Sequence, residues 1–141
     1  MKQKIGKILV PLDGSKTSIK GLEEAIYLAR QCGATITGIS IIPLYTIKLG
    51  KLLTELRNQS VKEVKKVMAD AKKVCAQNGI VFSEKIIFGN EAWEITEFAE
   101  YKKFDLIVMG SRGLGPFKTS FLGSIANTVV HRSKIPVLVV K

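Results

Sequence analysis

Three glycines and a serine late in the chain have the residue types and the spacing of a phosphate-binding loop. Gly110, Gly113 and Gly123 precede Ser124 in the pattern G-x2-G-x9-G-S. The loop follows a short apolar run and leads into an apolar-periodic segment that we predict to be a helix. At a helix start, unpaired N–H groups and the helix dipole favour an anion, and glycine lets the backbone approach it closely. The pattern therefore predicts a phosphate site.

The alternatives for this loop fit less well. A plain strand-to-helix turn needs only about 2 to 6 residues, and this loop is longer. No G-x4-G-K-[ST] pattern occurs, which excludes a Walker A loop. Gly113 and Gly115 begin like the dinucleotide pattern G-x-G-x-x-G, but Lys118 stands where the third glycine is required.

The spacing instead resembles the nucleotide-binding signature of the universal stress protein family, G-x2-G-x9-G-[S/T]. The opening segment 8–15 (ILVPLDGS) and the closing segment 133–140 (SKIPVLVV) are also similar to that family. The resemblance spans nearly the whole chain and is weakest over residues 43–60. It implies a Rossmann-like α/β fold, an open doubly wound sheet of five parallel strands in the order 3-2-1-4-5. It also implies ATP as ligand and a homodimer formed through the last strand, Val137–Val140.

The same resemblance implies which residues contact the nucleotide. In the family, the aspartate matching Asp13 lies at the ribose or the adenine, and the backbone at the position of Ile41 reads the adenine edge. Ser40 stands where relatives often have histidine. The predicted nucleotide-binding set is Pro11, Leu12, Asp13, Ile41, Met109, Gly110, Arg112, Gly113, Gly123, Ser124 and Ile125.

Several of these side chains have a second interpretation. By spacing alone, Asp13 suits a helix N-cap or an Asx-turn better than a ligand contact, and it is the family resemblance that favours the ligand contact. Arg112 and Lys118 suit either phosphate contacts or an ordinary basic surface. Mg²⁺ would be held through the phosphates, because no carboxylate cluster indicates a dedicated metal site. The single histidine, His131, falls at a predicted helix C-terminus, which favours a dipole interaction over catalysis.

Apolar runs and helical periods alternate along the chain. We predict strands over residues 7–11, 35–42, 80–88, 106–109 and 137–140, and helices over about 15–32, 54–78, 91–102 and 124–131. In such sheets ligands bind beyond the carboxyl ends of the strands, where the strand order reverses. That point brings Asp13 and Gly110 together. We expect Trp93 in the core and Lys62, Lys66 and Lys73 on a solvated helix face.

Composition limits the classes of protein. We expect one domain over residues 1–141, of ordinary apolar content at 46%. No apolar run reaches the roughly 20 residues of a membrane span, and no signal peptide is recognisable, so we expect a cytoplasmic protein. The net charge of +10 suits an anionic partner or a solvated surface, but without a nucleic-acid motif we do not expect nucleic acid. Cys32 and Cys75 lack metal or redox spacing, so we expect reduced, mostly buried thiols.

These observations predict an ATP-binding universal stress protein. It would act as a nucleotide-dependent signalling module for an unknown protein partner. Slow ATP hydrolysis is the first alternative, although no residue stands out as a general base or as the group that positions a water. A homodimeric scaffold that binds no nucleotide is the second. Some family members have lost the glycine motif, whereas this chain keeps it.

Overall fold

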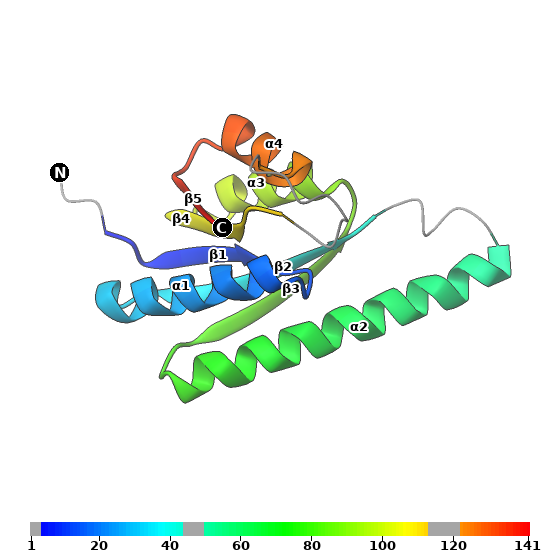
Figure 1. The fold of residues 1–141 in the computed structure, drawn as a ribbon, viewed down its shortest axis with the longest axis horizontal. Coiled ribbons are helices and arrows are strands. Elements are labelled where there is room, and N and C mark those ends of the chain that lie inside the picture. The colour runs from blue at the N-terminus through cyan, green and yellow to red at the C-terminus, as the bar shows by residue number, and fades with distance from the viewer. Residues whose placement is uncertain (1–3, 44–49, 113–121) are drawn as a thin grey trace.

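A computed structural model describes residues 4–43, 50–112 and 122–141, and its strands and helices alternate along the chain (Figure 1). The strands are β1 Lys7–Pro11, β2 Thr35–Ile42, β3 Phe82–Phe88, β4 Leu106–Gly110 and β5 Val137–Val140. The helices are α1 Lys16–Cys32, α2 Gly50–Gln77, α3 Glu91–Tyr101 and α4 Ser124–Arg132.

The strands form one parallel sheet in the order β3-β2-β1-β4-β5, which confirms the predicted fold class and topology. β1 lies in the middle, and Ile8, Leu9 and Val10 have no exposed surface because helices cover both faces of the sheet. A continuous apolar run suits such a strand, since neither of its faces meets water. The strand order reverses between β1 and β4, so the loops after these two strands diverge and leave a crevice.

Two layers of helix enclose the sheet. α1 and α2 cover one face, where Ile8 and Val10 pack with Met68 of α2, and α3 and α4 cover the other, where Leu9 packs with Ile107 and Val129 (Figure 1). Successive residues of β1 thus point into opposite cores, as the period of a strand requires. This packing fixes the carboxyl ends of the strands along one edge of the molecule.

Glycine and serine residues fix the ends of the helix that follows β1. Ser15 caps the N-terminus of α1, where its side chain accepts a hydrogen bond from the Ser18 N–H (3.2 Å). Gly33 ends α1 in the left-handed conformation, at φ 69°, and its N–H bonds to the Ala29 carbonyl. Glycine adopts that conformation without the steric cost that a Cβ would bring.

Two element boundaries differ from the sequence prediction by two residues or more. β3 begins at Phe82 and not at residue 80, because the Ile80 N–H bonds back to the Cys75 carbonyl (2.9 Å) at the end of α2. α2 begins at Gly50 and not at residue 54. Residues 51–53 (KLL) are good helix formers with no proline or capping residue among them, so nothing in the sequence stops the helix from starting earlier.

Trp93 is not a core residue, contrary to the expectation from its helical spacing. Its surface is 49% exposed, and the guanidinium carbon of Arg132 lies 4.0 Å from its ring centroid. The buried side of α3 consists of Ala92, Ile95, Thr96 and Ala99. Trp93 lies one residue out of that stripe, so its ring packs against a cation at the surface.

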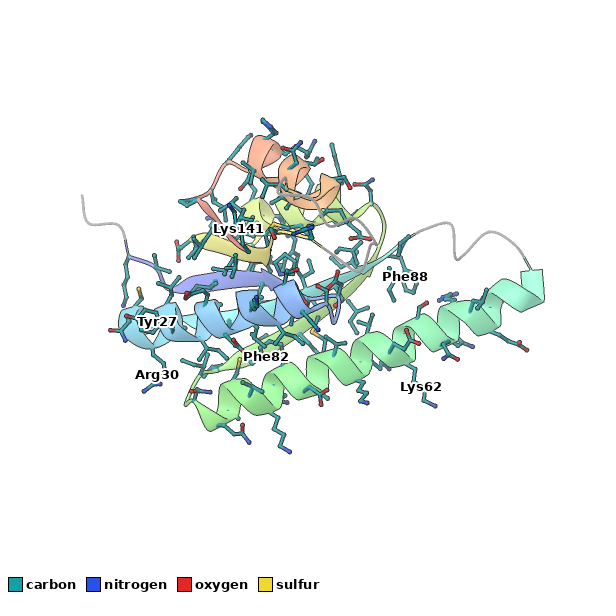
Figure 2. The ribbon with its side chains drawn as sticks, viewed as in Figure 1. Tyr27, Arg30, Lys62, Phe82, Phe88 and Lys141 are labelled. Atoms are coloured by element: carbon teal, nitrogen blue, oxygen red, sulfur yellow. The ribbon has the colours of Figure 1, made fainter. Side chains whose placement is uncertain are left out.

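Lys62, Lys66 and Lys73 of α2 are exposed as predicted, and Lys62 extends away from the body of the protein (Figure 2). Cys75 is buried, which raises the pKa of its thiol to about 11, whereas Cys32 is partly exposed and both are free thiols. Among the described residues, no helix has the length and apolar character needed to cross a membrane.

Candidate functional site

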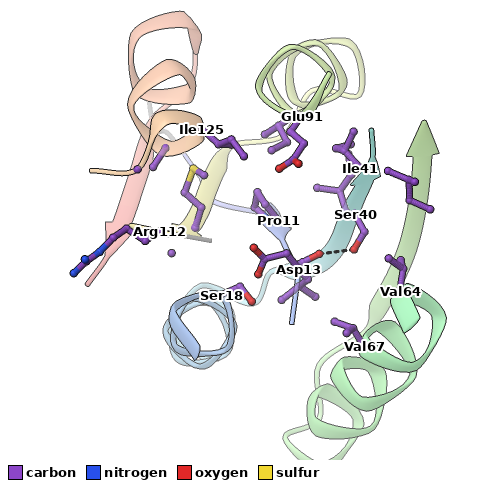
Figure 3. A pocket seen from close by; sticks show the side chains of 18 of the residues that line it. Pro11, Asp13, Ser18, Ser40, Ile41, Val64, Val67, Glu91, Arg112 and Ile125 are labelled. Atoms are coloured by element: carbon purple, nitrogen blue, oxygen red, sulfur yellow. Dashed lines mark hydrogen bonds between the residues drawn. The ribbon is translucent and has the colours of Figure 1, made fainter. Parts of the chain in front are cut away.

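A cavity of about 790 Å³ opens at the carboxyl edge of the sheet (Figure 3). The ends of β1, β2 and β4 form its floor, the first turn of α4 closes one side, and Ser60, Glu63, Val64 and Val67 of α2 line another. It lies at the β1–β4 reversal where the topology places ligands.

Nearly all of the predicted nucleotide-binding residues meet around this cavity. Its lining includes Pro11, Leu12, Asp13, Ile41, Met109, Gly110, Arg112, Gly123, Ser124 and Ile125. Gly113 and Lys118 lie outside the described residues. Residues from three strands and one helix, remote in sequence, therefore form a single surface.

Asp13 makes an Asx-turn and also lines the cavity. Its Oδ1 accepts a hydrogen bond from the Ser15 N–H (2.8 Å), which makes an Asx-turn over Gly14 at φ 83°. Ser15, and not Asp13, is the helix N-cap. The turn holds the Asp13 carboxylate at the cavity and occupies one of its oxygens.

Ser40 stabilises the segment that carries Asp13. Its buried hydroxyl donates a hydrogen bond to the Leu12 carbonyl oxygen (dashed line in Figure 3), and the Leu12 N–H donates to the Ile39 carbonyl (2.9 Å). These bonds fix the end of β1 to β2. The serine that stands in place of a family histidine therefore has a structural role in this chain.

The start of the glycine loop is attached to three other elements. The Ser111 N–H donates to the Val140 carbonyl of β5 (2.8 Å), and the Ser111 carbonyl accepts from the Gly123 N–H (2.8 Å). Thr17 of α1 donates its hydroxyl hydrogen bond to the Arg112 carbonyl. The two described ends of the loop, Ser111 and Gly123, are therefore held side by side.

The glycines at these two ends are needed for space and not for unusual dihedral angles. Gly123 has φ −62° and ψ 162°, which any residue adopts, but a Cβ there would lie 3.2 Å from the Ser111 carbonyl oxygen. A Cβ on Gly110 would lie 2.6 Å from the carbonyl carbon of Thr17. Gly110 thus lets α1 pack directly against the end of β4.

The N-terminus of α4 faces the cavity without a side-chain cap. Gly123 occupies the N-cap position and provides no side-chain cap, and the first turn contains no acidic residue. The first N–H groups of a helix have no partner within the helix itself. With Ser124 and Ile125 in the cavity lining, this end of the cavity supplies donors and a positive helix dipole suited to an anion.

Sequence reasoning missed Glu91, the first residue of α3. Its side chain enters the cavity near Pro11 and Ile41 (Figure 3). Burial, and then the negative charge of Asp13, raise the pKa of the Glu91 carboxyl above its usual value. An acidic residue in the first turn of a helix is common and does not by itself indicate a site. Glu91, however, follows shortly after a parallel strand, and such positions lie at the carboxyl edge of the sheet, where ligands bind. That position in the sequence could have identified Glu91 as a candidate.

Comparisons with known proteins agree with this fold. Residues 4–141 match the model of the family described as "Universal stress protein family". Universal stress protein YxiE of Bacillus subtilis is 34% identical, over 96% of this chain and 98% of its own length. The solved structure of hypothetical protein MJ0577, from Methanocaldococcus jannaschii, has a TM-score of 0.92 and 32% identity, and the match covers 99% and 97% of the two chains. An Archaeoglobus fulgidus universal stress protein in complex with dAMP has a TM-score of 0.77 and 22% identity, covering 96% and 98%.

Proposed function

The chain belongs to the universal stress protein family, and on that premise we propose that it binds an adenine nucleotide, ATP, in the cavity at the carboxyl edge of its sheet. The observation that carries the proposal is the uncapped N-terminus of α4, which opens into a large cavity at the β1–β4 reversal. A volume of about 790 Å³ falls within the roughly 300–1,000 Å³ of small-molecule sites.

The two ends of the cavity differ in the way that a nucleotide requires. At the α4 end, Ser124 and Ile125 would present backbone donors to the phosphates, whereas the Gly123 N–H is bonded to the Ser111 carbonyl. At the β2 end, Ile39, Ile41 and Pro43 would provide an apolar wall for a base, and the backbone of Ile41 would read its edge. Asp13 follows β1, between these ends, where a ribose would lie.

Mg²⁺ would enter with the phosphates. Within the described residues no group of three or more His, Cys, Asp or Glu side chains is placed to hold a metal ion. Mg²⁺ commonly keeps several waters and binds through substrate phosphates, so no protein cage is required.

The nucleotide would act as a switch. Ligand bound between Asp13, which follows β1, and the start of α4 would favour the arrangement of these segments that a partner protein recognises. The same proposal treats residues 1–141 as one domain. A family match over residues 4–141 supports that view.

We further propose a homodimer formed through β5. β5 is an edge strand of the sheet, and Leu138 on it is 39% exposed. An apolar edge of this kind favours pairing with another strand. Sedimentation velocity at micromolar concentration should give a dimer, and a stable monomer would contradict the assignment.

Calorimetric titration of the nucleotide-stripped protein with ATP and Mg²⁺ tests the binding function. We expect saturable binding with one nucleotide per chain, and weaker binding of AMP because it offers the α4 terminus fewer phosphate oxygens. A folded protein, verified to be free of nucleotide, that gives no binding heat with either nucleotide at several temperatures would contradict the proposal.

A further inference from the structure

Glu91 and Asp13 approach the cavity from opposite sides of the sheet. Asp13 lies on the segment from β1 to α1, and Glu91 begins α3, which packs on the other face. Figure 3 shows both side chains in the cavity, with the Glu91 carboxylate turned toward Pro11. Both residues line this one cavity, and their side chains are drawn within it in Figure 3.

The Glu91 carboxylate has no hydrogen-bond donor or cation of its own within the described parts of the chain. Burial, and then the like charge of Asp13, raise the pKa of the Glu91 carboxyl, and the Asp13 Oδ1 already accepts from the Ser15 N–H. Both groups can only accept hydrogen bonds when ionised. A ligand that displaces water from between them must therefore bring donors, since a desolvated carboxylate without a donor is costly.

The middle of a bound nucleotide carries such donors. β1 lies between β2 and β4 in the sheet, so a ligand whose base lies at β2 and whose phosphates lie at α4 passes Asp13 and Glu91 with its ribose. The ribose offers two neighbouring hydroxyl groups. Phosphates offer no donors at neutral pH, and two carboxylates would repel them.

We propose that Glu91 is a specificity-determining residue whose carboxylate accepts a hydrogen bond from a ribose hydroxyl, so that the protein prefers ribonucleotides to deoxyribonucleotides. The inference rests on the proposed binding of a nucleotide in this cavity. It adds a ligand contact from α3, whereas the glycine motif predicts no ligand contact from that helix.

Affinities for ATP, 2′-deoxy-ATP and 3′-deoxy-ATP, measured by calorimetry, test the assignment. A hydrogen bond to a charged group is worth about tenfold or more in affinity, so the wild-type protein should prefer ATP to at least one deoxy analogue by that factor. Glu91→Ala should reduce the preference to within about twofold, mainly by weakening ATP. Glu91→Gln keeps an acceptor oxygen of the same shape and should retain part of the preference.

Glu94→Gln is the matched control. Glu94 is the other acid in the first turn of α3 and does not line the cavity, so its variant should keep the wild-type preference. A Glu91→Ala protein that binds ATP with an unchanged preference would overturn the role of Glu91 and leave the nucleotide site standing. A wild-type protein that binds none of the three nucleotides would overturn the proposed function itself.

Discussion

Replacing Gly123 with valine is expected to lower the affinity for ATP by about 100-fold or more, because at least two charge-assisted hydrogen bonds at about 1.5–3 kcal/mol each are lost. A Cβ at this position already comes within 3.2 Å of the Ser111 carbonyl oxygen and 3.4 Å of the Arg112 Cα. The two further methyl groups of valine would separate the ends of the loop and break the Gly123 N–H bond to Ser111. Phosphates would then no longer reach the first turn of α4. The measurement is a calorimetric titration of the variant with ATP and Mg²⁺.

Asn127→Val is the control for Gly123→Val. It places the same β-branched residue in the same helix, at an exposed position outside the cavity lining. Its affinity should stay within about twofold of the wild-type value, since surface changes away from a site have small effects. Equal affinities of the wild-type protein and the folded Gly123→Val variant would show that the phosphates do not bind at α4.

Gly110→Ala is expected to destabilise the protein by about 1–3 kcal/mol, the usual cost of overpacking a core. The added Cβ would lie 2.6 Å from the Thr17 carbonyl carbon and 2.7 Å from both Thr17 oxygens, distances that no real Cβ contact adopts. Two of these atoms are backbone, so no side-chain rotation relieves the clash and α1 must move away from β4. Chemical denaturation followed by circular dichroism measures the free energy of unfolding.

Gly6→Ala provides the comparison for Gly110→Ala. A Cβ on Gly6 would meet only the Asp105 Oδ2, at 3.6 Å, and Gly6 is not among the glycines with positive φ. Its free energy of unfolding should change by less than about 0.5 kcal/mol, because the added methyl group would make only an ordinary van der Waals contact. Similar unfolding free energies for both variants would contradict the close packing of α1 against β4.

The sheet could be predicted because clear sequence patterns mark its strands. Continuous apolar or β-branched runs give β1, β2 and β5 the predicted bounds. Such a run is typical of a central strand like β1, which is buried on both faces. The surface position of Trp93 could not be predicted. In the sequence, an apolar residue one position outside a buried stripe fits the helical pattern of a core residue equally well. Its contact with Arg132 depends on how α3 and α4 pack.

The cavity could be predicted in part because its residues directly follow strands. Asp13 and Gly110 come immediately after β1 and at the end of β4, and topology alone brings these positions together. Glu91 could not be recognised from its type, because acids are common in first helix turns. Its role depends on facing Asp13 across the sheet. Gly110 was expected to make room for a ligand, whereas the atoms nearest to its missing Cβ belong to Thr17.

Backbone amide NMR during titration with ATP and Mg²⁺ tests the central claim most directly, because it reports both binding and location. We predict that the amide resonances of Ser124, Ile125 and Asp13 shift and saturate together, whereas those of Lys62 and Lys73 on the basic face of α2 do not move. Saturable shifts confined to that basic face, with the α4 terminus unaffected, would contradict the proposed nucleotide site.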